Sequence, residues 1–138
     1  MTNQLFLTTL ALTIPVLNHG ASMHKEKETL LEATEATPAV LYKIISVEHW
    51  QQSQGKELVM LAPEDNNFIH FAKEDQFQKV ATKYWSNKPY VLLMVDVIKL
   101  TGSLVFESNT PTGTKYYHMY NGSIPMNAVI SSKLVHNK

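Results

Sequence analysis

Two histidines stand inside short apolar segments, where an imidazole ring needs a hydrogen-bond partner. His70 lies in the segment FIHFA and His118 lies in YYHMY, and burying an unpaired polar ring costs free energy. One interpretation is that each is a half-buried histidine whose ring is satisfied by the backbone. The other is that both rings face one cleft, where an imidazole can act as an acid, a base or a ligand contact.

A carboxylate and an ammonium group also interrupt apolar segments. Glu107 ends the segment SLVFE, and Lys43 lies inside VLYKII. The carboxylate of Glu107 is either an ordinary group at a strand edge or one that hydrogen-bonds a sugar hydroxyl and steers a transferred group. The stem of Lys43 can pack against its neighbours while the ammonium reaches water or a carboxylate.

Four tyrosines add aromatic surface as core residues or as the wall of a pocket. Strand alternation predicts that Tyr116 and His118 share one face and that Tyr117 lies on the other. The four are Tyr42, Tyr116, Tyr117 and Tyr120.

Composition excludes several classes of site. The 138 residues include no arginine and no cysteine, so disulfides, thiolate metal sites and cysteine nucleophiles are absent. An anion site must use lysine, histidine or backbone N–H groups, because arginine forks are missing. Without a basic stripe we expect no nucleic-acid partner. The histidine spacings match no helical zinc motif, so we expect no metal. The sequence also contains no P-loop, GxGxxG or GxSxG motif.

The first residues have the pattern of an export signal. An apolar segment runs from Leu5 to Leu17 and is followed by Gly20, Ala21 and Ser22, which is the length of a signal-peptide core and too short for a membrane span. We expect a signal peptide over 1–22, a polar linker over 23–38 and a folded domain over 39–138. The expected location is periplasmic or secreted, with no stable membrane anchor after cleavage. The alternative is an N-terminal helix in a cytoplasmic protein.

Hydrophobic periodicity predicts an α+β domain. β-branched and apolar runs predict short strands, and helical spacing with capping residues predicts two helices. Because the helices come early and the strands cluster late, a repeating βαβ sheet is disfavoured. Strands are expected over 40–45, 68–72, 90–98, 103–107, 115–120 and 128–131, with helices over 47–54 and 73–85.

Five segments follow one another in order between Leu41 and Ile130: LYKI, NFIHFAKEDQF, YVLLMVDVIKL, VFES and YYHMYNGSIPMNAVI. Together they resemble a small bacterial family, the domain of unknown function family 952. That family resembles the ADP-ribosyltransferases in fold, especially the histidine-based branch that includes the tRNA 2′-phosphotransferases. The resemblance implies a split antiparallel β core with a cleft that can hold NAD.

The resemblance also implies roles for single residues. Lys43 and His70 stand where the transferases place two histidines that line the NAD pocket, and Tyr120 is expected beside them as a third cofactor contact. His70, Glu107 and His118 are the expected catalytic residues.

The expected function is an NAD- or nucleotide-binding cleft with ADP-ribosyl transfer, and the expected partner is a small-molecule or nucleotide ligand. The first alternative is a non-catalytic module on the same fold that binds a ligand or a protein. The second is a structural exported domain that works by protein contact. The sequence leaves the oligomeric state open.

Overall fold

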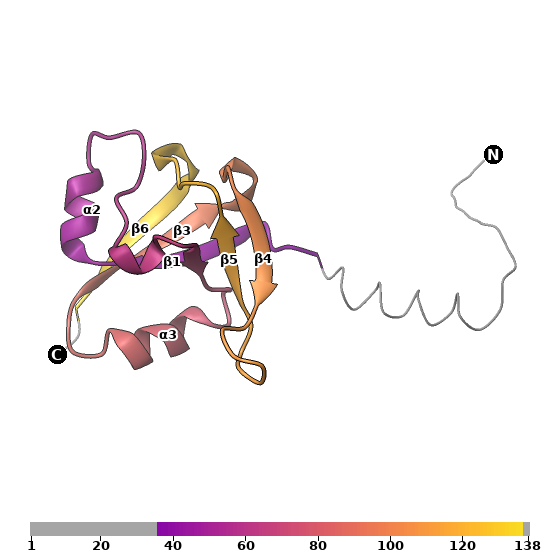
Figure 1. Cartoon of the computed structure of the whole chain (residues 1–138). Coiled ribbons are helices and arrows are strands. Elements are labelled where there is room, and N and C mark those ends of the chain that lie inside the picture. The colour runs from indigo at the N-terminus through magenta and orange to yellow at the C-terminus, as the bar shows by residue number, and fades with distance from the viewer. Residues whose placement is uncertain (1–35, 137–138) are drawn as a thin grey trace, which may run out of the picture. The chain divides into compact units, whose positions relative to one another are not determined.

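The computed structural model describes residues 36–136. The predicted signal peptide over 1–22 and most of the predicted linker lie outside the described residues, so the domain boundary near Ala39 stays a prediction. The described part contains two three-stranded antiparallel sheets and two α-helices (Figure 1), which confirms the α+β fold. Within residues 36–136, no helix has the length and apolar character needed to cross a membrane.

The first sheet has the strand order β1-β3-β6 and is antiparallel throughout. β1 (Val40–Ile45), β3 (Tyr90–Asp96) and β6 (Val129–Val135) form it. β3 is the central strand, because it pairs with β1 along one edge and with β6 along the other.

The predicted C-terminal ends of two strands in this sheet are wrong. β3 stops at Asp96 instead of residue 98, because the Asp96 side chain accepts a hydrogen bond from the backbone N–H of Ile98 and starts the 3₁₀ turn η2 (Val97–Lys99). β6 continues to Val135, well past residue 131. The later residues of β6 are polar and exposed, so the sequence shows no strand pattern there. Their backbone nevertheless pairs with β3 as far as Tyr90.

The second sheet has the strand order β2-β5-β4. β2 (Ile69–Phe71), β4 (Ser103–Glu107) and β5 (Tyr116–Tyr120) form it, and a hairpin joins β4 to β5. His70 pairs directly with His118 across β2 and β5. Ile69 and Phe71 belong to the hydrophobic core, so alternation places His70 on the opposite face of β2.

Two short helices and two further 3₁₀ turns complete the framework. α2 (Val47–Ser53) begins where the Ser46 side chain accepts from the backbone N–H of His49, and Gly55 follows it with φ +78°. The helix ends there because glycine adopts a positive φ without a steric penalty. The other elements are α3 (Phe77–Tyr84), which begins four residues later than the predicted helix over 73–85, and the 3₁₀ turns η1 (Pro63–Asp65) and η3 (Met126–Ala128).

The hydrophobic core draws on both sheets. Leu41 and Leu93 come from the first sheet and Met119 from the second, and all three are almost fully buried. Trp50 of α2 packs against this cluster.

Backbone pairing joins β1 to the end of β2. The N–H of Tyr42 donates to the carbonyl of Ala72 at 2.8 Å, and the N–H of Ala72 donates back at 2.9 Å. Lys43 follows Tyr42 directly, so this pairing brings it close to the segment that carries His70.

Two glycines lie at the open end of the β4–β5 hairpin, opposite the loop that joins the two strands. A Cβ on Gly122 would lie 2.4 Å from the backbone nitrogen of Gly102, closer than non-bonded atoms approach. The chain segments before β4 and after β5 therefore pass each other at a distance that only glycine permits.

We predict that Gly122→Ala destabilises the domain by about 1–3 kcal/mol, since the new methyl group must push two backbones apart. Urea unfolding followed by circular dichroism measures the change. Ser123→Ala is the matched control, because the two hydrogen bonds of Ser123 use its backbone N–H and its backbone carbonyl. Equal stability of the two variants would contradict the close approach.

Candidate functional site

The Lys43 ammonium lies in the interior and not at the surface. Lys43 shares its face of β1 with the core residues Leu41 and Ile45, and only 5% of it is exposed. Its Nζ donates to Oδ1 of Asp65 at 2.9 Å. Burial lowers the pKa of Lys43, and the Asp65 charge and hydrogen bond oppose that shift. The Asp65 carboxylate is thus the partner that a buried ammonium requires.

One oxygen of Asp65 collects three donors. Besides the Lys43 ammonium, Oδ1 accepts from the backbone N–H of His70 at 3.0 Å and from the His70 ring Nδ1 at 2.9 Å. Because an ionised carboxylate only accepts, the proton of this ring contact lies on Nδ1. Burial raises the pKa of Asp65, but the His70 hydrogen bonds and the Lys43 charge outweigh it and lower the pKa to about 2.

A second carboxylate–histidine pair lies on β4 and β5. The His118 Nδ1 donates to Oε2 of Glu107 at 2.9 Å, and the Tyr120 hydroxyl donates to the same oxygen. The Tyr120 hydrogen bond, followed by that of His118, lowers the pKa of Glu107. The same carboxylate raises the pKa of Tyr120. Glu107 is therefore an ionised acceptor at neutral pH.

Phe68 joins the two pairs. Its ring stacks on His118 with centroids 4.1 Å apart and contacts the rings of His70 at 4.8 Å and Tyr120 at 5.3 Å. The rings of His70 and His118 are themselves 5.4 Å apart. Contacts therefore connect seven side chains, which we call the paired-histidine cluster: Lys43, Asp65, Phe68, His70, Glu107, His118 and Tyr120.

The cluster unites every residue that the sequence analysis selected for a site. Lys43, His70, Glu107, His118 and Tyr120 all belong to it, although their roles stay predictions. The alternative in which backbone groups satisfy the histidine rings is wrong, because both rings donate to carboxylates. His118 is also fully buried, with 2% exposed, and not half-buried.

Sequence reasoning missed Asp65 and Phe68. A lysine in an apolar strand indicates a nearby carboxylate, but the sequence offers several and gives no distance to choose among them. Phe68 reads as one more apolar residue of the strand, and its place between the two imidazoles depends on the pairing of β2 with β5.

Comparison with known proteins identifies the family. The family model described as "Protein of unknown function (DUF952)" matches residues 44–132, which is more than half of the chain. The chain belongs to this family. A search of curated proteins found no match for this DUF952 domain.

Solved structures share its fold. The X-ray crystal structure of protein CC0527 from Caulobacter crescentus is 24% identical, with a TM-score of 0.60 over 69% of this chain and 84% of that chain. A double mutant of CC0527 is 23% identical, with a TM-score of 0.59 over the same shares. At this identity the likeness shows the fold alone, and the relationship to ADP-ribosyltransferases stays a prediction.

The cluster of this DUF952 domain presents two acceptor atoms. With Nδ1 of His70 bound to Asp65, its Nε2 has no hydrogen bond within residues 36–136, and 43% of the side chain is exposed. The Glu107 side chain is 34% exposed, and both of its hydrogen bonds use Oε2. A neutral His70 ring and the Glu107 Oε1 can therefore accept hydrogen bonds from a bound molecule.

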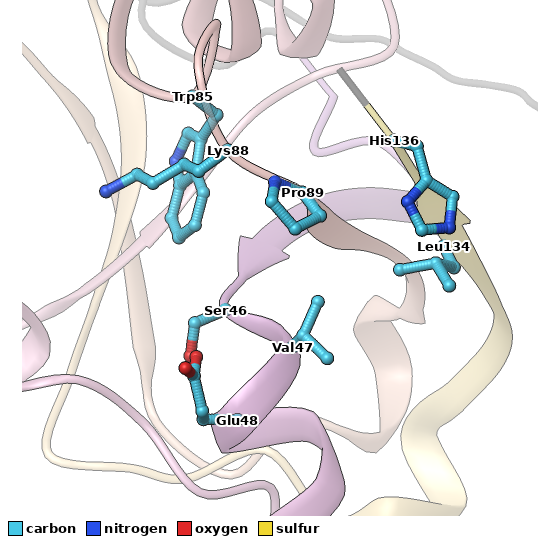
Figure 2. A pocket seen from close by; sticks show the side chains of 8 residues that line it. All are labelled: Ser46, Val47, Glu48, Trp85, Lys88, Pro89, Leu134 and His136. Atoms are coloured by element: carbon cyan, nitrogen blue, oxygen red, sulfur yellow. The ribbon is translucent and has the colours of Figure 1, made fainter. Parts of the chain in front are cut away.

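A cavity lies elsewhere in the DUF952 domain. A space of about 440 Å³ is lined by the start of α2, the loop between α3 and β3, and the end of β6, and the side chains that line it are labelled in Figure 2. Its apolar wall includes Val47, Pro89 and Leu134, and no member of the paired-histidine cluster lines it. In the described part of the chain, no three acidic or histidine side chains are grouped to hold a metal ion.

We predict that Lys43→Met costs about 3 kcal/mol of stability, because it leaves the Asp65 carboxylate buried without its cation. The double variant Lys43→Met/Asp65→Asn should lose less, since neither charge remains. Urea unfolding of both variants, and of Asp65→Asn alone, measures the coupling. A double variant at least as unstable as Lys43→Met would refute a dominant ion-pair contribution.

The lowered pKa of Asp65 predicts an acid dependence. Because the folded pKa of about 2 lies below the ordinary 3.8, the ionised form stabilises the fold above about pH 4. That contribution, about 2 kcal/mol for a shift of nearly two units, is lost as the pH falls toward 2. Asp65→Asn should therefore lose less stability than the wild type between pH 5 and pH 2. The exposed Asp75→Asn serves as control and should follow the wild type. Parallel stability curves for Asp65→Asn and the wild type would contradict the assignment.

Proposed function

We propose that the paired-histidine cluster binds a nucleotide, with NAD as the candidate ligand and ADP-ribosyl transfer as the candidate reaction. The observation that carries the proposal is that two carboxylate–histidine pairs from separate strands meet on one aromatic ring, Phe68. Such an arrangement combines oriented polar groups with a flat apolar surface, as small-ligand sites do.

The chemistry of each group fits this reaction. In ADP-ribosyl transfer the bond between the ribose C1′ and the nicotinamide nitrogen breaks, and its electron pair leaves with neutral nicotinamide. A hydroxyl or water then bonds to C1′ and gives up its proton. The ionised Glu107 can stabilise the positive charge that develops on the ribose ring, and Nε2 of His70 can take the proton.

The aromatic side chains support a ligand with a planar ring. The Phe68 ring contacts the rings of His70 and Tyr120, and aromatic side chains stack on bases whatever their identity. Buried His118 acts in this proposal by holding Glu107, since its ring is only 2% exposed.

A titration of the whole chain with NAD, followed by amide NMR spectra, tests binding. We expect millimolar NAD to shift the amides of Phe68, His70 and Tyr120 and His70→Ala to abolish these shifts. His136→Gln removes an exposed histidine outside the cluster and should change nothing. Spectra that do not move at millimolar NAD would refute nucleotide binding by this cluster.

A second candidate is a non-catalytic binding module on the same fold. The observation that favours it is that the Lys43 charge is already paired with Asp65, so this lysine does not offer a pyrophosphate a free cation. Nicotinamide release during the titration separates the two candidates. Release that is lost in Glu107→Gln supports transfer, whereas shifts without release support binding alone.

A further inference from the structure

The Lys43–Asp65 ion pair is built into the fold at a point where three elements meet. Lys43 comes from β1, Asp65 from η1 and its other partner His70 from β2. Both charged side chains are only 6% exposed. The ammonium and the imidazole donate to the same carboxylate oxygen, at 2.9 Å each.

Stability alone does not account for this pair. Desolvation of two buried charges offsets most of their attraction, so apolar residues of similar size often serve a fold equally well. What an apolar pair cannot do is accept the proton of the His70 Nδ1. The carboxylate therefore gives the imidazole one tautomer and one orientation, which leaves Nε2 as its acceptor atom.

Lys43 is poorly placed for the ligand contact that the family resemblance implies. Moving its Nζ to a phosphate would leave the buried Asp65 carboxylate without its cation, and an unpaired buried charge is costly. The existing contact at 2.9 Å instead keeps Asp65 ionised and directed at His70.

We propose that Lys43 and Asp65 are positioning residues, which hold His70 in the Nδ1–H tautomer and present its Nε2 to a ligand. Lys43 acts through Asp65 and does not touch the ligand. This inference rests on the proposed role of His70 as a ligand contact, but the state of the ring can be measured without any ligand.

Nitrogen-15 NMR of the imidazole rings in the whole chain tests the proposal, at a pH above the range in which histidines titrate. We expect His70 in a single Nδ1–H tautomer in the wild type. Asp65→Ala should populate the Nε2–H form, and Asp65→Asn should largely restore the Nδ1–H form through its amide oxygen. In Lys43→Met the His70 ring signals should shift toward those of Asp65→Ala.

The His118 ring is an internal control for folding. It donates to Glu107 independently of Asp65, so its Nδ1–H signature should persist in every folded variant. A wild-type His70 in the Nε2–H form would overturn the proposal even if a variant fails to fold. Unchanged His70 signals in a folded Asp65→Ala would overturn it as well.

Titration with NAD separates a positioning role for Lys43 from a phosphate contact. A positioning role predicts a dissociation constant about tenfold higher in Lys43→Met, equivalent to about 1.4 kcal/mol, with the salt dependence of the wild type. A phosphate contact predicts a flatter salt dependence in the variant, because a screened charge pair has been removed, and that result would overturn the assignment. Absence of NAD binding to the wild type would refute the proposed function, while the tautomer measurement still decides this inference.

Discussion

An ammonium group buried on the core-facing side of a strand is the constraint around which this domain is arranged. Lys43 requires a carboxylate in the interior, and Asp65 supplies it from a short 3₁₀ turn. That requirement fixes the turn before β2, and the same carboxylate oxygen holds the ring of His70. The carboxylate that balances the buried Lys43 ammonium therefore also orients the partly exposed imidazole of His70.

The sequence predicted the regular elements well where local chemistry dominates. β1 matches its apolar β-branched run residue for residue, and Ser46 and Gly55 bracket α2 as capping rules require. The errors have one local and one tertiary cause. The Asp96 side chain ends β3 inside an apolar run, and β6 is held by pairing with β3 and not by its own pattern.

Sequence reasoning could find some residues of the candidate site but not their partners. Polar residues inside apolar segments are visible as anomalies, which is why Lys43, His70 and His118 could be selected. Their partners are not anomalous where they stand: Asp65 looks like part of a polar turn, and Phe68 looks like part of a strand. What unites them is the direct pairing of His70 with His118 and the joining of Tyr42 to Ala72, and neither pairing can be read from one sequence.

The shortness of β2 has a consequence for how such a domain can diversify. β2 has three residues, and the outer two, Ile69 and Phe71, are committed to the core. A single position of this strand, that of His70, is therefore free to contribute to the outer face. The candidate site has no redundancy there, because β2 offers it a single side chain. Any other contribution to this face must come from neighbouring loops or from β5.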